Sequence, residues 1–234
     1  MIYLTGDIHG DPTPVEQFCK KMNPTSSDII VILGDVGANY WGDWRDGVTK
    51  MRLNRLAPTV FCIHGNHENR PSNIPTYKQR EWNGGIVWVE DKYPNVLFAK
   101  DGEIIDLEGK KAIVLGGAYS VDKYYRLMRG YHWWSDEQPS EEIKQYAEQQ
   151  LDRIGWSVDV VLSHTCPLHY EPIEMFLPGI DQSTVDASTE EWLGEIEKKL
   201  NYNKWFCGHW HINKRIDKMY FLMHDFEELE DTHD

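Results

Sequence analysis

Eight side chains that can bind a metal ion or transfer a proton follow five short apolar stretches of this sequence. They are Asp7, His9, Asp35, Asn66, His67, His164, His209 and His211. Each lies one to four residues beyond an apolar run, and such runs predict buried strands. Open α/β sheets keep their functional groups at the carboxyl ends of strands. A single histidine is more often structural than a ligand, but five strand ends with the same chemistry predict one shared site.

The types of side chain in this set restrict the metal. Carboxylates, imidazoles and one amide oxygen, with no thiolate in any of these motifs, suit Mn²⁺ best, then Fe or Zn²⁺, and disfavour an iron–sulfur or structural zinc site. The ligands are too many for one ion, so we expect two divalent metal ions roughly 3.5–4 Å apart that share a carboxylate. Asp35 is the natural bridge, because it is the one strand-end carboxylate without a ligand partner beside it. A water that bridges two such ions loses a proton near neutral pH and becomes the nucleophile.

The elements that must position these side chains predict an α/β fold. Apolar runs predict strands at 2–5, 28–33, 59–63, 158–162 and 204–207. Helical spacing of apolar residues predicts helices at 12–22, 48–56, 139–154 and 188–200. Asp11 ahead of Pro12 is a candidate cap for the first helix, and Ser188 with Glu191 predicts a capping box for the last.

The remaining stretches are less regular. Four strand candidates with short turns between residues 86 and 115 predict a meander, and 214–224 predicts a final hairpin or strand. The polar-aromatic segment 121–137 is either a packed surface loop or a cap that faces the substrate, with a slight preference for the cap. Acidic residues within 226–234 predict a solvated tail. No internal repeat or linker divides the chain, so we expect a single domain over 1–234.

Composition narrows the class of protein. The net charge of −14 argues against a protein that binds long nucleic acid by neutralising phosphates. The four cysteines are far apart and form no Cys-x-x-Cys pair, so we expect free thiols in a reducing compartment. No signal peptide and no apolar run of membrane-spanning length are found, so we expect a soluble, cytoplasmic protein with no membrane partner. The sequence leaves the oligomeric state open.

The five strand endings resemble the signature blocks of the calcineurin-like metallophosphoesterases. The blocks are Gly-Asp-Ile-His-Gly (6–10), Gly-Asp-Val-Gly (34–37), Gly-Asn-His-Glu (65–68), Ser-His (163–164) and Gly-His-Trp-His (208–211), in this order. The resemblance implies a sandwich of two mixed β-sheets flanked by α-helices, with the metal site at the carboxyl ends of strands. It also implies hydrolysis of phosphate esters, with the metal-bridging hydroxide attacking phosphorus in line.

The same resemblance implies a role for each residue of the site. Asp7, His9 and His211 would hold one metal, Asn66, His164 and His209 the other, and Asp35 would lie between them. His67 would lie beside the leaving-group oxygen and donate a proton or stabilise charge there. Glu68 would hydrogen-bond a histidine ring behind the ligands.

One block departs from a branch of the family, the serine/threonine protein phosphatases. There the second block continues Val-Asp-Arg-Gly and supplies a phosphate-binding arginine, whereas this sequence has Val36-Gly37-Ala38-Asn39. Arg70 and Arg126 are candidate substitutes, because a guanidinium can clamp a phosphoryl group with two hydrogen bonds; either can equally be a surface residue.

The substrate class therefore stays open at the level of sequence. We favour a phosphomonoesterase that acts on a small phosphate ester or a phosphoprotein. A phosphodiesterase that acts on cyclic nucleotides or other small diesters is the alternative, and a non-catalytic binding module on the same fold is a third possibility.

Overall fold

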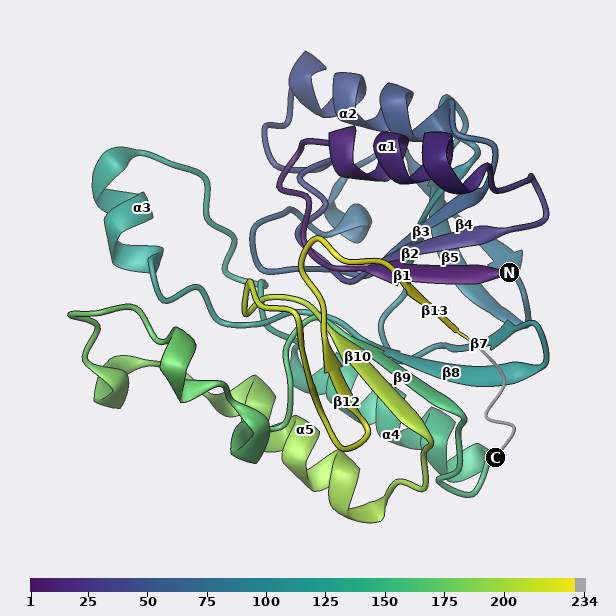
Figure 1. The fold of residues 1–234 in the computed structure, drawn as a ribbon. Helices are drawn as coiled ribbons and strands as arrows, with labels where there is room; N and C mark the ends of the chain where they lie inside the picture. Colours follow the sequence, from purple (N-terminus) through teal and green to yellow (C-terminus); the bar gives the residue numbers. More distant parts are fainter. Residues whose placement is uncertain (230–234) are drawn as a thin grey trace.

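Two mixed β-sheets face each other in the computed structural model, which describes residues 1–229 (Figure 1). The first sheet has the order β13 (Glu227–Glu228), β1 (Ile2–Thr5), β2 (Ile29–Ile32), β3 (Thr59–Cys62), β6 (Val96–Ala99), β5 (Gly85–Glu90) and β4 (Tyr77–Trp82). The second has the order β11 (Lys214–Ile216), β12 (Met219–Phe221), β10 (Lys204–Cys207), β9 (Val160–Ser163), β8 (Lys110–Leu115) and β7 (Ile104–Leu107). The sandwich expected from the sequence is confirmed.

Parallel strands form the centre of each sheet. In the first sheet β1, β2, β3 and β6 are parallel, and in the second β8, β9, β10 and β12 are parallel. Their side chains are buried on both faces, which explains why the strands read as continuous apolar runs. Leu4, Val31 and Phe61 pack between the sheets, whereas their chain neighbours Tyr3 and Ile30 face the other way.

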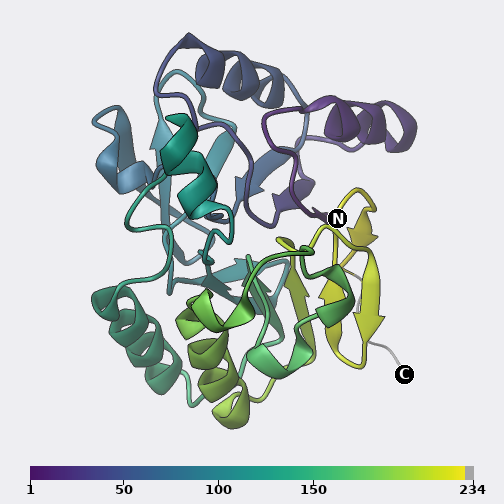
Figure 2. The same ribbon diagram turned by 90° about the vertical axis from the view of Figure 1, so that its left-hand side faces the viewer.

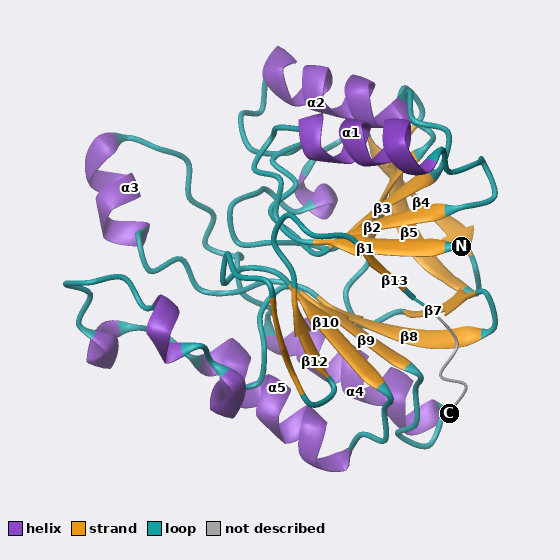
Figure 3. Cartoon of the chain, in the orientation of Figure 1, coloured by secondary structure: helices purple, strands orange, loops and turns teal. Residues whose placement is uncertain are grey.

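Helices cover the two outer faces. Helices α1 (Thr13–Met22) and α2 (Trp44–Asn54) lie over the first sheet, and α4 (Glu141–Arg153) and α5 (Ser188–Lys199) lie over the second (Figure 3). Leu193 and Ile196 of α5 pack on Trp205 of β10, and each such fully buried side chain stabilises the fold by about 1.5–3 kcal/mol.

The strands that carry the site motifs end at the same end of the molecule. The loop after β1 bonds the loop after β2, since the His9 N–H donates to the Asp35 carbonyl at 2.8 Å. Likewise the Gly208 N–H donates to the His164 carbonyl at 3.0 Å, which joins the loops after β10 and β9. Figure 2 looks onto this end, with the short helix α3 (Lys123–Arg129) and the chain around residues 168–187 in front of the sheets. The latter contains three short 3-10 turns, Leu168–Tyr170, Ile173–Met175 and Gln182–Thr184; a fourth, Pro71–Asn73, follows β3.

Some expectations for individual elements were wrong. The strands between residues 85 and 115 do not form one meander, because β5 and β6 belong to the first sheet and β7 and β8 to the second. Strand β4 was not predicted, since it is an exposed edge strand of mostly polar residues, YKQREW. The capping box at Ser188 is also absent: Asp186 accepts the Ser188 N–H, and the Ser188 hydroxyl contacts Gln138.

The C-terminal region also differs from the expected solvated tail. Glu227 and Glu228 pair with β1, and Leu229 is buried in the core between the sheets with its N–H bonded to the Ile2 carbonyl. The rest of the predicted tail, 230–234, lies outside the described residues. No helix in the described part of the chain is both long and apolar enough to cross a membrane.

Candidate active site

The loops after β1, β2, β3, β9 and β10 bring all eight predicted site residues together. Two carboxylates anchor the loops to each other: Asp7 Oδ1 accepts the His209 N–H at 3.0 Å, and Asp35 Oδ1 accepts the His67 N–H at 2.8 Å. Glycine is required at Gly65, where a Cβ atom would lie 2.1 Å from Asp35 Oδ1. The glycines of the motifs therefore allow backbone to approach the carboxylates closely.

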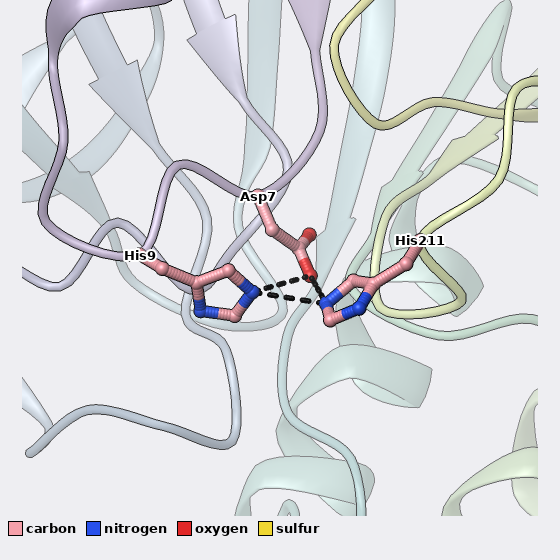
Figure 4. A group of neighbouring side chains, drawn as sticks. All are labelled: Asp7, His9 and His211. Carbon is pink, nitrogen blue, oxygen red and sulfur yellow. Dashed lines mark hydrogen bonds and ion pairs between the residues drawn. The ribbon is translucent and has the colours of Figure 1, made fainter. Parts of the chain in front are cut away.

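Asp7, His9 and His211 converge in the first half of the site (Figure 4). The Nε2 atoms of His9 and His211 are 2.9 Å apart, and they lie 3.8 Å and 3.3 Å from Asp7 Oδ2. Burial lowers the pKa of His9, whereas the Asp7 carboxylate raises the pKa of His211. Asp7 Oδ2 is buried and makes no hydrogen bond within the described chain. Two imidazole nitrogens and one unsatisfied carboxylate oxygen thus point at a common position.

Asn66, His164 and His209 converge in the second half. His164 Nδ1 lies 2.7 Å from the Leu33 carbonyl and must donate to it, so the lone pair of a neutral ring is on Nε2. That Nε2 lies 2.9 Å from Asn66 Oδ1, and His209 Nδ1 lies 3.1 Å from the same oxygen. Burial lowers the pKa of His209 to about 3, which keeps its ring neutral.

Asp35 lies between the two halves. Its Oδ2 is 3.8 Å from His9 Nδ1 and 3.4 Å from His67 Nδ1, while its Oδ1 is 3.6 Å from His164 Nε2. Burial opposes ionisation of this carboxyl, but the surrounding histidines and the His67 N–H lower its pKa overall. An ionised, almost fully buried carboxylate requires positive charge beside it.

These observations fit divalent cations at both positions. In the second half, the Nε2 lone pair of a neutral His164 faces the Asn66 amide oxygen, an arrangement that is repulsive unless a cation or an extra proton lies between them. In the first half, the buried Asp7 Oδ2 has no hydrogen bond within the described chain to offset its charge. The donor set contains carboxylate, imidazole and amide groups and no thiol, which suits divalent cations.

Strained backbone marks the same residues. His9, Asp35, His209 and His211 have φ angles of 45°, 45°, 64° and 51°, in the left-handed region that residues other than glycine rarely adopt. Each strained residue lowers the stability of the fold by about 1–3 kcal/mol, and such strain concentrates at functional sites.

His67 lies beside the two halves with a partner that the sequence analysis did not assign. Its Nδ1 faces Asp35, and its Nε2 is 3.5 Å from Asp122 Oδ1. Burial opposes protonation of this ring, but the charge of Asp35 and the contact with Asp122 raise the pKa of His67. Asp122 stands at the start of the irregular segment 121–137 and has no metal-motif signal, so only the fold reveals its position.

The two candidate arginines differ in location. Arg126 lines a cleft of about 170 Å³ together with His9, His67 and Tyr40. Its guanidinium is held by Asp122 Oδ2 at 2.9 Å and by the Tyr40 hydroxyl at 3.2 Å. The structure does not bring Arg70 into the site: it is buried behind it, paired with Asp101 and donating to the Asp136 carbonyl.

Glu68 is buried behind the ligands, but it does not contact a histidine ring as expected. Its Oε1 accepts the Gly65 N–H at 3.1 Å, and burial raises the pKa of this carboxyl to about 8. Glu68 therefore holds the turn that carries Asn66 and His67.

Comparisons with known proteins agree with this geometry. The sequence profile of the family described as calcineurin-like phosphoesterase matches residues 1–213. The chain belongs to the calcineurin-like phosphoesterase family. The fold is similar to that of a phosphopantetheinyl hydrolase from Mycobacterium tuberculosis, with a TM-score of 0.54 and 14% identity over 95% of this chain and 87% of that one. No curated protein sequence matches significantly.

Membership of this family makes the protein a metal-dependent phosphoesterase. The family uses divalent metal ions and acts on phosphoesters, and the Asp/His clusters described above are candidates to hold the ions.

Proposed function

We propose that this phosphoesterase hydrolyses phosphate monoesters, of a small molecule or a phosphoprotein, with two Mn²⁺ ions. Asp7, His9 and His211 would hold one ion, Asn66, His164 and His209 the other, and Asp35 would lie between them. When bound, the ions would neutralise charge on the phosphoryl oxygens and make water a stronger nucleophile. His67 would donate a proton to the leaving-group oxygen, and Asp122 would hold the His67 ring in position.

The position of the Arg126 guanidinium supports a monoester substrate. A bound phosphomonoester exposes terminal oxygens that carry charge, and Arg126 offers a fixed guanidinium in the cleft that also contacts His9 and His67. Tyr40 and Trp41 line the same cleft and would equally accept the second organic group of a small diester, which keeps phosphodiester hydrolysis as the second candidate.

The test compares p-nitrophenyl phosphate with bis-p-nitrophenyl phosphate in Mn²⁺ and after chelation. We expect chelator-sensitive turnover with a higher kcat/KM for the monoester. Arg126→Ala should raise KM for the monoester about tenfold or more. Arg129→Ala, at the exposed end of the same helix, is the matched control and should leave KM unchanged. A preference for the diester that Arg126→Ala does not alter would contradict the proposal.

We also propose that the protein resides in the cytoplasm. All four cysteines are free, and three are buried, as expected for a protein that resides in the reducing cytoplasm.

A further inference from the structure

A second cavity shares His67 with the Arg126 cleft and lies between the predicted metal-binding residues and an apolar wall. Its volume is about 320 Å³, within the range of small-molecule sites. At one end it is lined by Asp35, Asn66 and His67. The wall consists of apolar side chains from the irregular segment after β9, namely Met175, Phe176, Leu177, Ile180 and Val185.

This wall is attached to the metal-binding loop. Phe176 stacks on Trp210, with ring centroids 5.9 Å apart, and Trp210 lies between His209 and His211 in the chain. Glu174 forms an ion pair with Lys214, the first residue of β11. Tyr119 and Val121 contribute further apolar surface to the cavity. The cavity thus extends the site along a surface held in a defined position.

The charged groups of the cavity, apart from the histidines, are all acidic. Glu171, Glu190 and Asp122 line it, and no lysine or arginine appears among its described lining residues. Glu190 is 4% exposed, so its carboxyl faces little water. A second phosphate or a carboxylate placed here would lose its hydration and find no lysine or arginine among the described residues of the cavity wall to replace it, which disfavours an anionic group.

We propose that this cavity binds the organic part of the substrate, and that the preferred substrates are phosphate esters of apolar, uncharged alcohols. The ester phosphorus would lie at the metal-binding residues, and the aryl or branched-alkyl group of the alcohol would lie against Leu177 and Ile180. This inference rests on the proposed function, since it names the substrate class of the same site.

Two pairs of esters test the proposal on the Mn²⁺-loaded protein. Phenyl and para-butylphenyl phosphate differ in apolar size, with nearly equal leaving groups. The para-(carboxyethyl)phenyl and para-(carbamoylethyl)phenyl esters differ in charge at nearly constant size. We expect kcat/KM to be about tenfold or more higher for the butyl ester than for the phenyl ester, and for the amide than for the carboxylate.

Variants show whether the cavity causes these ratios. Leu177→Ser and Ile180→Ser should bring the butyl-to-phenyl ratio close to one. Ile173→Ser is the matched control, because Ile173 lies in the same segment, is 73% exposed and does not line the cavity. Butyl-to-phenyl ratios near one in the wild-type protein, or an equal fall in the Ile173→Ser variant, would overturn the inference.

Binding separates this inference from the proposed function. The affinities of phenylphosphonate and para-butylphenylphosphonate can be compared by calorimetry without turnover. A preference for the butyl compound with no hydrolysis of any ester would support the cavity assignment and refute the proposed function. Hydrolysis of the esters without any preference would refute the cavity assignment alone.

Discussion

The side-chain amide of Asn66 donates a 2.9 Å hydrogen bond to the hydroxyl of Ser120, and this contact directs the amide oxygen toward His164 and His209. The Ser120 hydroxyl in turn donates to Glu137 Oε2 at 2.6 Å, and Glu137 Oε1 accepts the Ser120 N–H at 3.1 Å. All three residues are buried. Ser120 and Glu137 therefore fix which end of the Asn66 amide faces the metal-binding position.

Ser120→Ala should weaken metal binding at the second position. The Asn66 amide would lose its acceptor and could present its N–H groups to the position instead of its oxygen. Loss of such outer contacts typically costs about 10–100-fold in metal affinity or activity. Mn²⁺ titration followed by calorimetry measures the effect, with the exposed Ser27→Ala as control. An unchanged affinity for both ions would refute the role of Ser120.

His67→Ala should retain the metal ions but lower kcat, most severely for esters with poor leaving groups, because these depend most on a proton donor. Asp122→Asn should give a smaller loss of kcat with the same dependence on the leaving group, since Asp122 positions the His67 ring. It should also raise KM, because Asp122 holds the Arg126 guanidinium. A series of aryl phosphates with graded leaving groups, together with metal analysis of each variant, provides the measurement. If either variant binds fewer ions, the division between ligand and proton donor is wrong.

His211→Gly should be more stable than His211→Ala by about 1 kcal/mol, because φ at this position is 51° and only glycine adopts it without strain. Both variants remove the same side chain, which is half exposed, so packing differs little between them. Denaturant unfolding of both proteins in chelator measures the difference in free energy of unfolding. Equal stabilities would show that this backbone position carries no strain.

Glu190→Gln should change the pH dependence of stability. Burial raises the pKa of Glu190 from 4.5 to about 7 in the folded protein. Because the folded pKa lies above the unfolded one, the stabilisation is complete below the unfolded pKa and is lost as pH rises through about 7. As the pH rises from about 4 to about 8, the free energy of unfolding of the wild-type protein should fall by about 3 kcal/mol more than that of the variant. Denaturant unfolding at each pH gives the free energy of unfolding of both proteins as a function of pH. Parallel curves would exclude this effect.

Much of the fold was predictable because its central strands are buried on both faces. Val31 and Leu33 face one side and Ile30 and Ile32 the other, so the strand stands out in the sequence without its neighbours. Strand β4 lacks that signal, because it is an edge strand whose polar side chains face water. Strand β13 lacks that signal too, since it consists of two glutamates, and the adjacent Leu229 is the residue that enters the core.

The site was predictable as far as its residues follow strands. Asp7 and His164 each lie two residues beyond the apolar run of a strand, so topology alone brings them together. Ser120, Asp122 and Glu137 lie in irregular chain, and their roles depend on contacts across long sequence separations. Arg70 shows the converse: its place beside a motif suggested a phosphate contact, but its side chain turns to Asp101.

The central claim is that these residues form a two-metal site that hydrolyses phosphate esters, and Asp35 tests it most directly. Metal content and turnover of p-nitrophenyl phosphate should be measured for the wild-type protein and for Asp35→Asn, after incubation with Mn²⁺. The account predicts two Mn²⁺ ions per wild-type chain, turnover that disappears with chelation, and loss of both bound metal and turnover in the variant. An Asp35→Asn protein with full metal content and full activity, or a wild-type protein that binds no Mn²⁺, would contradict it.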